Sequence, residues 1–177
     1  MKIVDYLVQN GEEHDDTLHK KLFSVNVRLL KTSRIYFSTI KNIVKSMEYL
    51  LNKEFLDYGK PHGISGANVG VPLNIITIKT KDSNLTMLNP ELIDCSKETR
   101  IVSSNCGSLN LKESVQVKRY KEVKVRYYPF ISKLTWREHV KKNVIPREES
   151  FSLGTIQHEI DHNNGVLIID KVVEEVG

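Results

Sequence analysis

Two histidines and a glutamate near the C-terminal end of the sequence have the spacing of a metal-binding helix. His158 and His162 are four residues apart, and Glu159 directly follows the first of them. On an α-helix, residues at positions i and i+4 share one face, so both imidazoles can reach the same cation. A carboxylate one step round the helix can exchange a proton with a water molecule on that cation. The pattern H-E-x-x-H therefore predicts a catalytic metal site.

The alternative is a polar helix face that carries two histidines by chance, because matches of this length do occur at random. Against it, the motif lies at the end of a segment with an apolar face and is followed by Gly165, a typical helix stop. We therefore favour the metal site.

A catalytic site of this type needs a third protein ligand and an open coordination position. Zinc proteases with this motif take the ligand from a later histidine, but that position is Ile168 here. A later glutamate would have to come from Glu174 or Glu175, at the very end of the chain. We therefore expect an upstream ligand. The upstream candidates are His62, Cys95, Cys106 and His139.

The context of Cys106 favours it over the other candidates. It lies in the polar stretch 104–108, directly after an apolar segment, as a ligand at a strand edge would. Gly107 lets the backbone approach closely at this point. Cys95 is interpreted as a small structural residue near a turn.

Two helices and several strands are expected to position these residues. A helix over residues 35–55 is predicted by apolar residues that recur every three or four positions, and a second helix over 148–164 carries the metal motif. Strands are predicted at 73–78, 85–88 and 123–127, and a glycine-rich turn at 59–70. Residues 129–146 fit no clear pattern. Strands first and the key helix late indicate an α+β fold.

The composition is that of a globular domain, with 177 residues of which 40% are hydrophobic and 27% charged, so one domain over 1–177 is expected. The net charge of +4 comes from Lys and Arg spread along the chain, without the cluster that nucleic-acid binding needs. No stretch approaches the ~18 apolar residues of a membrane span, and the first residues lack a signal-peptide core. We expect a cytoplasmic protein without a membrane or specific nucleic-acid partner.

Around these residues the sequence resembles the peptide deformylases, a family that removes the N-formyl group from nascent polypeptides. Residues 157–162 match the family's metal-helix motif Q-H-E-x-D-H in full, and 165–170 are similar to the G-V-L-F-x-D that follows it. Residues 88–92 resemble the family's I-N-P-x-I strand end. The likeness extends from about Ile35 to Lys171.

Two further motifs of the family are altered in this sequence. The loop motif G-x-G-x-A-A-x-Q aligns with residues 61–68, where Ser65 and Gly66 replace the alanines and Asn68 replaces the glutamine. The motif E-G-C-L-S aligns with 104–108 and keeps only Cys106 and Ser108. The metal motif is therefore intact, whereas the residues that would face the substrate differ.

The resemblance implies antiparallel sheets packed around a central metal-binding helix. It assigns Cys106, His158 and His162 as ligands of one divalent ion, with Fe²⁺ expected and Zn²⁺, Ni²⁺ or Co²⁺ as alternatives. Glu159 would take a proton from the attacking water and return it to the leaving amine. The side-chain amide of Asn68 and the backbone N–H of Gly107 would stabilise the oxyanion.

The resemblance also implies a set of substrate-binding residues. His62 and Ser104 replace family residues and would change the pocket for the first side chain, which is commonly methionine in the family. For His62 a surface position is the alternative, and for Asp161 a solvated helix carboxylate is the alternative to a role in orienting a ligand. The expected substrate-binding residues are His62, Gly63, Ile64, Ser104 and Asn105.

Formylated peptide N-termini are the expected partners, with ribosome association as a further expectation. Three functions stay open, of which we prefer a deformylase with shifted specificity. The second is a hydrolase of another N-acyl or formamide substrate on the same scaffold. The third is a non-catalytic metal-binding relative. The presence of Glu159 argues against it, because a purely structural metal site does not need this carboxylate.

Overall fold

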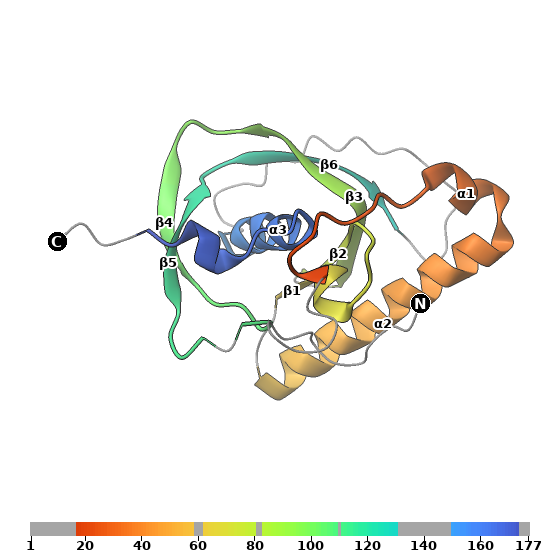
Figure 1. Ribbon diagram of the computed structural model, residues 1–177, viewed down its shortest axis with the longest axis horizontal. Coiled ribbons are helices and arrows are strands. Elements are labelled where there is room, and N and C mark those ends of the chain that lie inside the picture. Colours follow the sequence, from red (N-terminus) through yellow and green to blue (C-terminus); the bar gives the residue numbers. More distant parts are fainter. Residues whose placement is uncertain (1–16, 59–61, 81–82, 110, 131–149, 174–177) are drawn as a thin grey trace.

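A helix near the C-terminal end of the chain, α3 (Ser150–Asn163), lies at the centre of the fold, and the strands curve around it (Figure 1). The structure is a computed structural model and describes residues 17–58, 62–80, 83–109, 111–130 and 150–173. The predicted helix over 148–164 is thereby confirmed. Residues 131–146 of the segment without a clear pattern lie outside the described residues.

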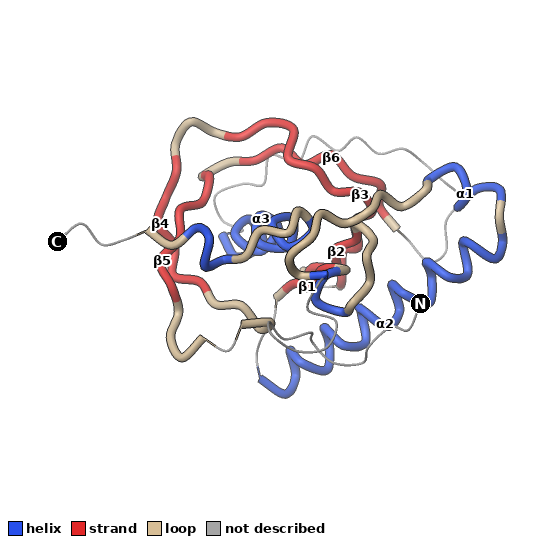
Figure 2. Tube along the Cα trace, in the orientation of Figure 1, coloured by secondary structure: helices blue, strands red, loops and turns tan. Residues whose placement is uncertain are grey.

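A four-stranded antiparallel sheet in the order β1-β2-β3-β6 forms one side of the fold (Figure 2). Its strands are β1 (Gly63–Ser65), β2 (Ile75–Lys79), β3 (Asn84–Cys95) and β6 (Val123–Pro129). The predicted strands at 73–78, 85–88 and 123–127 are confirmed, although β3 is longer than predicted. The predicted turn at 59–70 is wrong in part, because it contains β1 and the short 3₁₀ helix η2 (Ala67–Val69).

A second sheet pairs β4 (Thr99–Ser104) with β5 (Val115–Tyr120), and neither strand was predicted. Val117 and Arg119 of β5 are buried, while the alternating residues Gln116, Lys118 and Tyr120 are exposed. A charged residue on the inner face conceals the alternation of a half-buried strand. The short 3₁₀ helix η3 (Ile168–Lys171) follows α3 and contacts β5.

The long helix α2 (Arg34–Tyr58) covers the sheet on the side away from α3 and confirms the helix predicted at 35–55. Over residues 34–53, where burial is described, its buried residues are the predicted stripe of Ile40, Ile43, Val44, Met47, Leu50 and Leu51. The preceding short helix α1 (Val27–Thr32) is capped by Asn26, whose Oδ1 accepts from the backbone N–H of Leu29 at 3.0 Å. Six residues are too short a stretch to show apolar residues that recur at helical spacing, so α1 was not predicted.

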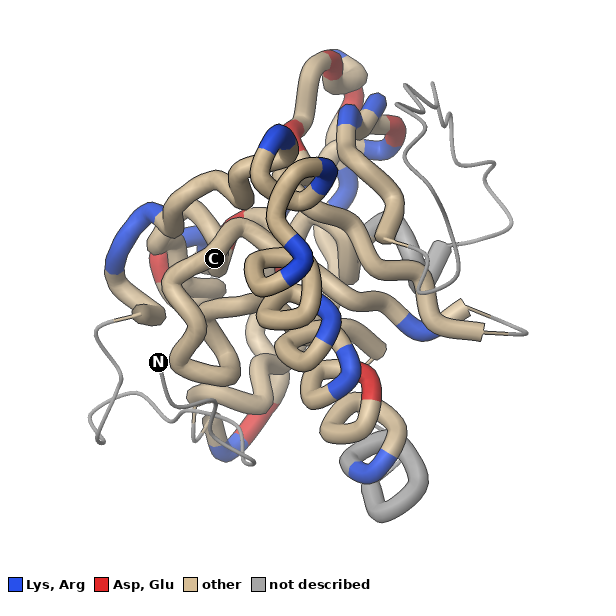
Figure 3. The backbone as a smooth tube through the Cα atoms, turned by 90° about the vertical axis from the view of Figure 1, so that its right-hand side faces the viewer, with Lys and Arg blue, Asp and Glu red and all other residues tan. Residues whose placement is uncertain are grey.

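Lys and Arg positions recur along α1 and α2, with few acidic positions between them (Figure 3). The exposed members are Arg28, Lys31, Arg34, Lys45 and Lys53. None of the helices in the described ranges is sufficiently long and apolar to cross a membrane.

Candidate metal centre

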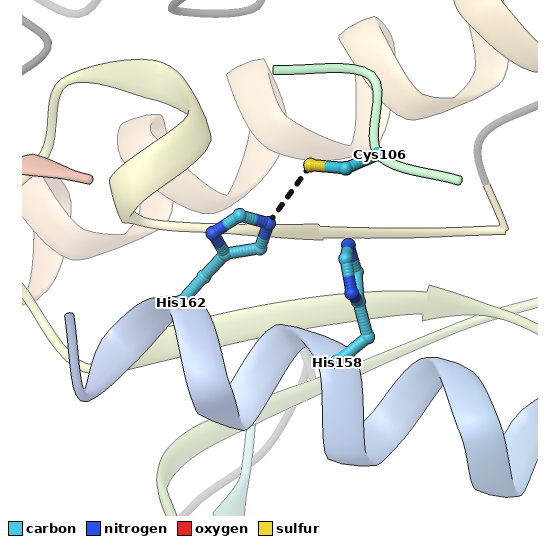
Figure 4. Close-up of side chains that lie close together, drawn as sticks. All are labelled: Cys106, His158 and His162. Atoms are coloured by element: carbon cyan, nitrogen blue, oxygen red, sulfur yellow. Dashed lines mark hydrogen bonds between the residues drawn. The ribbon is translucent and has the colours of Figure 1, made fainter. Parts of the chain in front are cut away.

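Three side chains from two distant parts of the chain meet beside α3 (Figure 4). Cys106 follows β4, and the rings of His158 and His162 project toward it from the helix. The Cys106 Sγ lies 3.2 Å from Nε2 of His162, and one potential ligand atom from each residue lies within 4.8 Å of the others. This spacing suits a single divalent ion with N and S ligands.

Burial keeps both histidines neutral and therefore able to bind a cation. His162 is 1% exposed, and burial lowers its pKa to about 4, against the influence of Asp161. Burial also holds the pKa of His158 well below its ordinary value, assisted by the nearby His162. Because a protonated imidazole cannot bind a metal, these shifts favour metal binding near neutral pH.

The thiol of Cys106 is buried and, without a cation, strongly prefers its neutral form. Burial raises its pKa to about 12, and Glu159 adds to the increase. Hydrogen bonds from the backbone N–H groups of Ser108 and Leu109 act in the opposite direction by favouring the thiolate. A divalent cation is the group that would stabilise the thiolate here, since metal-bound cysteines lose their proton.

Glu159 is 4% exposed, and burial raises the pKa of its carboxyl to about 8. Such a pKa allows the group both to accept and to donate a proton near neutral pH. Its Oε2 and Nδ1 of His162 are buried without a hydrogen-bond partner among the described residues. Unpaired polar atoms in a buried cluster indicate a missing ligand or water. The donor set and these atoms therefore fit a metal ion with a water molecule.

Side chains of α3 bind the helix to the second sheet through hydrogen bonds and an ion pair. The side-chain amide of Gln157 forms two hydrogen bonds with the backbone of Tyr120, accepting at 3.0 Å and donating at 3.1 Å. Asp161 forms an ion pair with Arg119 and a second one, of 2.6 Å, with Lys171. Asp161 is therefore buried in an ion-pair cluster, and the alternative of a solvated carboxylate is wrong. These contacts set the position of both histidines.

Removal of Arg119 is expected to destabilise the protein. Arg119→Ala leaves the buried Asp161 without its main partner and should lower the free energy of unfolding by about 3–5 kcal/mol. Lys171 is partly exposed, so Lys171→Ala should cost about 1 kcal/mol or less. Urea denaturation of both variants and the wild type measures the difference. Equal small effects would contradict a structural role for the buried pair.

The position of Glu159 depends on the lack of a side chain at Gly63. A Cβ atom at Gly63 would lie 2.5 Å from Cγ2 of Thr155, 2.9 Å from Cγ of Glu159 and 3.0 Å from its Oε1. Distances below 3 Å require a neighbour to move. Gly63 thus lies beside the Glu159 carboxylate, and its contact with substrate stays a prediction.

Gly63→Ala is expected to displace Glu159 and to lower kcat/KM roughly a hundredfold, since a shift of ~1 Å at a catalytic group has an effect of that size. Bound metal should be retained because the three atoms nearest to the added Cβ belong to Thr155 and Glu159 and not to the proposed ligands. Gly154→Ala on α3 is the matched control, since a Cβ there meets nothing within 4 Å. Initial rates of the enzymatic reaction give kcat/KM for both variants, and elemental analysis gives their metal content. Full activity in Gly63→Ala would show that Glu159 does not need this space.

The remaining predicted residues lie around the centre in different environments. Asn68 is 6% exposed, and its amide bonds to Ser65 and Ser108. Gly107 is exposed in the turn after Cys106. Ile64 is fully buried in the hydrophobic core, so its side chain packs against protein atoms. His62, Ser104 and Asn105 remain: His62 is partly buried, Ser104 ends β4, and Asn105 Oδ1 accepts from the Cys106 N–H at 2.7 Å.

Sequence reasoning missed Arg119, which lies on an unpredicted strand. The strand could have been recognised from the alternation of Val115, Val117 and Arg119, in which the arginine side chain takes an inward-facing position. Cys95, by contrast, ends β3 and is not part of the ligand group, as predicted.

Comparisons with known proteins agree with this geometry. The family model described as polypeptide deformylase matches residues 12–176. The peptide deformylase of Thermotoga neapolitana is 32% identical over 111 residues, which are 62% of this chain and 61% of that protein. The peptide deformylase of Thermotoga maritima is 28% identical over 132 residues, which are 75% of this chain and 73% of that protein.

Solved structures show the same fold. The crystal structure of the Thermotoga maritima peptide deformylase has a TM-score of 0.68 at 21% identity and covers 95% of this chain and 97% of that one. The Met-Ala-Ser-bound peptide deformylase of Acinetobacter baumannii has a TM-score of 0.65 at 21% identity, covering 97% of this chain and 100% of that one. The family model spans nearly the whole sequence, and this protein therefore belongs to the polypeptide deformylase family.

Proposed function

We propose that this protein is a metal-dependent hydrolase that removes the formyl group from the N-terminal formyl-methionine of nascent polypeptides. Membership of the family supports the reaction. The observation that carries the proposal is the arrangement of Cys106, His158 and His162, whose ligand atoms lie within 4.8 Å of one another beside the buried Glu159. A structural metal site would not need that carboxylate.

Cys106, His158 and His162 would hold the metal ion. When bound, the ion supplies positive charge that acidifies a water molecule and polarises the formyl carbonyl. Thiolate and imidazole ligands suit several divalent ions, and we propose Fe²⁺. Elemental analysis of freshly purified protein tests this, and zinc as the dominant ion together with lower activity of iron-loaded protein would contradict it.

Glu159 would move the proton in both halves of the reaction. Its carboxylate accepts a proton as water adds to the formyl carbon, and the carboxylic acid then donates this proton to the departing amine nitrogen. The C–N bond breaks, and formate and a free N-terminus leave. The raised pKa of Glu159, about 8, suits a group that must perform both transfers.

Two donors would stabilise the negative charge on the formyl oxygen. They are the backbone N–H of Gly107, which lies in the turn directly after the ligand Cys106, and the side-chain amide of Asn68. Such donors lower the barrier because they are oriented before the reaction begins. His62, Gly63, Ser104 and Asn105 are proposed to line the path of the peptide, and Ile64 would contribute only its backbone because its side chain packs in the core.

The test is formate release from formyl-Met-Ala-Ser by iron-loaded protein prepared without oxygen. Turnover of the formyl peptide, with little turnover of acetyl-Met-Ala-Ser, would support the proposal. The polar residues His62 and Ser104 favour one alternative, hydrolysis of a different N-acyl substrate. Activity on the acetyl peptide alone would favour that alternative. Bound metal without turnover of either peptide would indicate a non-catalytic relative.

We also propose that the protein meets its substrate at the ribosome in the cytoplasm. The exposed basic residues of α1 and α2 support this, because such a surface attracts the anionic ribosome at low ionic strength (Figure 3). Co-sedimentation with ribosomes that weakens in Lys45→Glu/Lys53→Glu, but not in the surface control Lys124→Glu, would support it. Equal ribosome binding by the wild type, the double variant and the Lys124→Glu control would contradict the proposal.

A further inference from the structure

A buried network of hydrogen bonds surrounds the side-chain amide of Asn68. Its Oδ1 accepts from the backbone N–H of Ser65 at 2.7 Å and from the Ser65 hydroxyl at 2.6 Å. Its Nδ2 donates to Oγ of Ser108 at 2.9 Å. The exposed fractions are 0% for Ser65, 6% for Asn68 and 1% for Ser108, so solvent does not compete with these bonds.

These bonds determine which way the amide faces. The backbone N–H of Ser65 can only donate, so the Asn68 atom beside it must be the oxygen. Both lone pairs of this oxygen are then used, and one of the two N–H groups of Nδ2 is bonded to Ser108. The second N–H has no partner among the described residues. Because an amide is planar, the direction of that second N–H is fixed.

The network is linked to the metal ligands through Ser108. The backbone N–H of Ser108 donates to the sulfur of Cys106, while the Ser108 hydroxyl accepts from Asn68. The same turn therefore holds both the proposed ligand and the proposed oxyanion donor. A change in the orientation of the Asn68 amide would alter its position relative to the Cys106 sulfur.

We infer that Ser65 is a positioning residue whose hydroxyl orients the Asn68 amide, so that its second N–H donates to the formyl oxygen of the substrate. The inference rests on the proposed function. Where the family motif combines alanine with the longer glutamine, this chain combines serine with the shorter asparagine. The hydroxyl of Ser65 adds a second bond to Asn68 Oδ1 beside that of its own backbone N–H, and the two bonds together hold the shorter side chain in place. The two positions therefore act as a pair.

The inference is tested with Ser65→Ala, Asn68→Gln and the double variant, which restores the family's combination. Ser65→Ala should lower kcat on the order of tenfold with little change in KM, because the donor acts on the transition state. Asn68→Gln should also lose activity, because the longer glutamine side chain would collide with the Ser65 hydroxyl. The double variant should recover to within about threefold of the wild type, since contacting residues are not additive. Losses that simply multiply would overturn the inference.

A matched control separates positioning from stability. Thr86→Val removes another buried hydroxyl bond, the 2.9 Å contact between Thr77 and Thr86 in the sheet. This variant should unfold at a lower temperature without a change in kcat. An equal loss of kcat in Thr86→Val and Ser65→Ala would mean that activity reports stability alone, and the inference would be wrong.

A second measurement does not depend on turnover. In zinc-loaded, ¹⁵N-labelled protein, the Asn68 side-chain amide signals are identified by their disappearance in Asn68→Asp. Ser65→Ala should shift both signals, whereas Thr86→Val should leave them in place. Shifted signals in a protein that never releases formate would overturn the proposed function but keep the positioning role. Unmoved signals in an active protein would overturn the positioning role itself.

Discussion

Glu159→Gln is expected to lower kcat by roughly 10²–10⁴, because the amide cannot carry the proton from water to the leaving amine. The metal should stay bound, since Glu159 is not among the three proposed ligands. Burial raises the pKa of this carboxyl to about 8 from 4.5, so above pH 4.5 it destabilises the metal-free fold. The variant should therefore unfold at an equal or higher temperature than the wild type at pH 7.

Rates of formate release, metal content and thermal unfolding measure the three effects of Glu159→Gln. Glu91→Gln makes the same chemical change at an exposed carboxylate that pairs with Arg126, and it should keep wild-type activity. Wild-type turnover in Glu159→Gln would exclude this residue as the proton carrier. Loss of metal together with activity would instead make it a structural support.

Cys106→Ala is expected to lose the metal ion. Loss of a residue that merely supports a ligand reduces metal affinity about 10–100-fold, so loss of the thiolate should reduce it at least about a hundredfold. Metal that binds only the folded state stabilises it, by about 2.7 kcal/mol at a free concentration 100 times Kd. Added metal should therefore raise the unfolding temperature of the wild type but not of Cys106→Ala.

Cys95→Ala is the control for Cys106→Ala. Cys95 ends β3 outside the ligand group, so this variant should bind metal and be stabilised by it as the wild type is. Metal content after dialysis and the shift of the unfolding temperature provide two independent measurements. A loss of metal in Cys95→Ala, with retention in Cys106→Ala, would overturn the ligand assignment.

Elements with a regular pattern of burial could be predicted from the sequence. The buried stripe of α2 recurs at helical spacing, and β6 alternates between Val123, Val125 and Tyr127 inside and more exposed residues outside. The shorter elements could not be found in this way. β1 has three residues inside a glycine-rich segment, and β5 places the charged Arg119 on its inner face.

The part of the site that lies within one short stretch of sequence could be predicted. His158, Glu159 and His162 share one helix, so their spacing alone indicates their arrangement. Cys106 lies 56 residues from His162, and its assignment needed the polar context and the family motif. The role of Ser65 could not be predicted, because its bond to Asn68 depends on how the chain turns into η2.

The central position of α3 has a consequence for how the protein is made. The central helix of the fold is synthesised after all the strands that enclose it. Until residues 150–163 have left the ribosome, the strands have no helix against which to bury Ile76, Met87 and Val125, which later pack beside Ile156 and Ile160. Such exposed apolar surface makes unfinished chains prone to aggregate. Assembly of the strands around α3 must therefore wait until residues 150–163 have been translated.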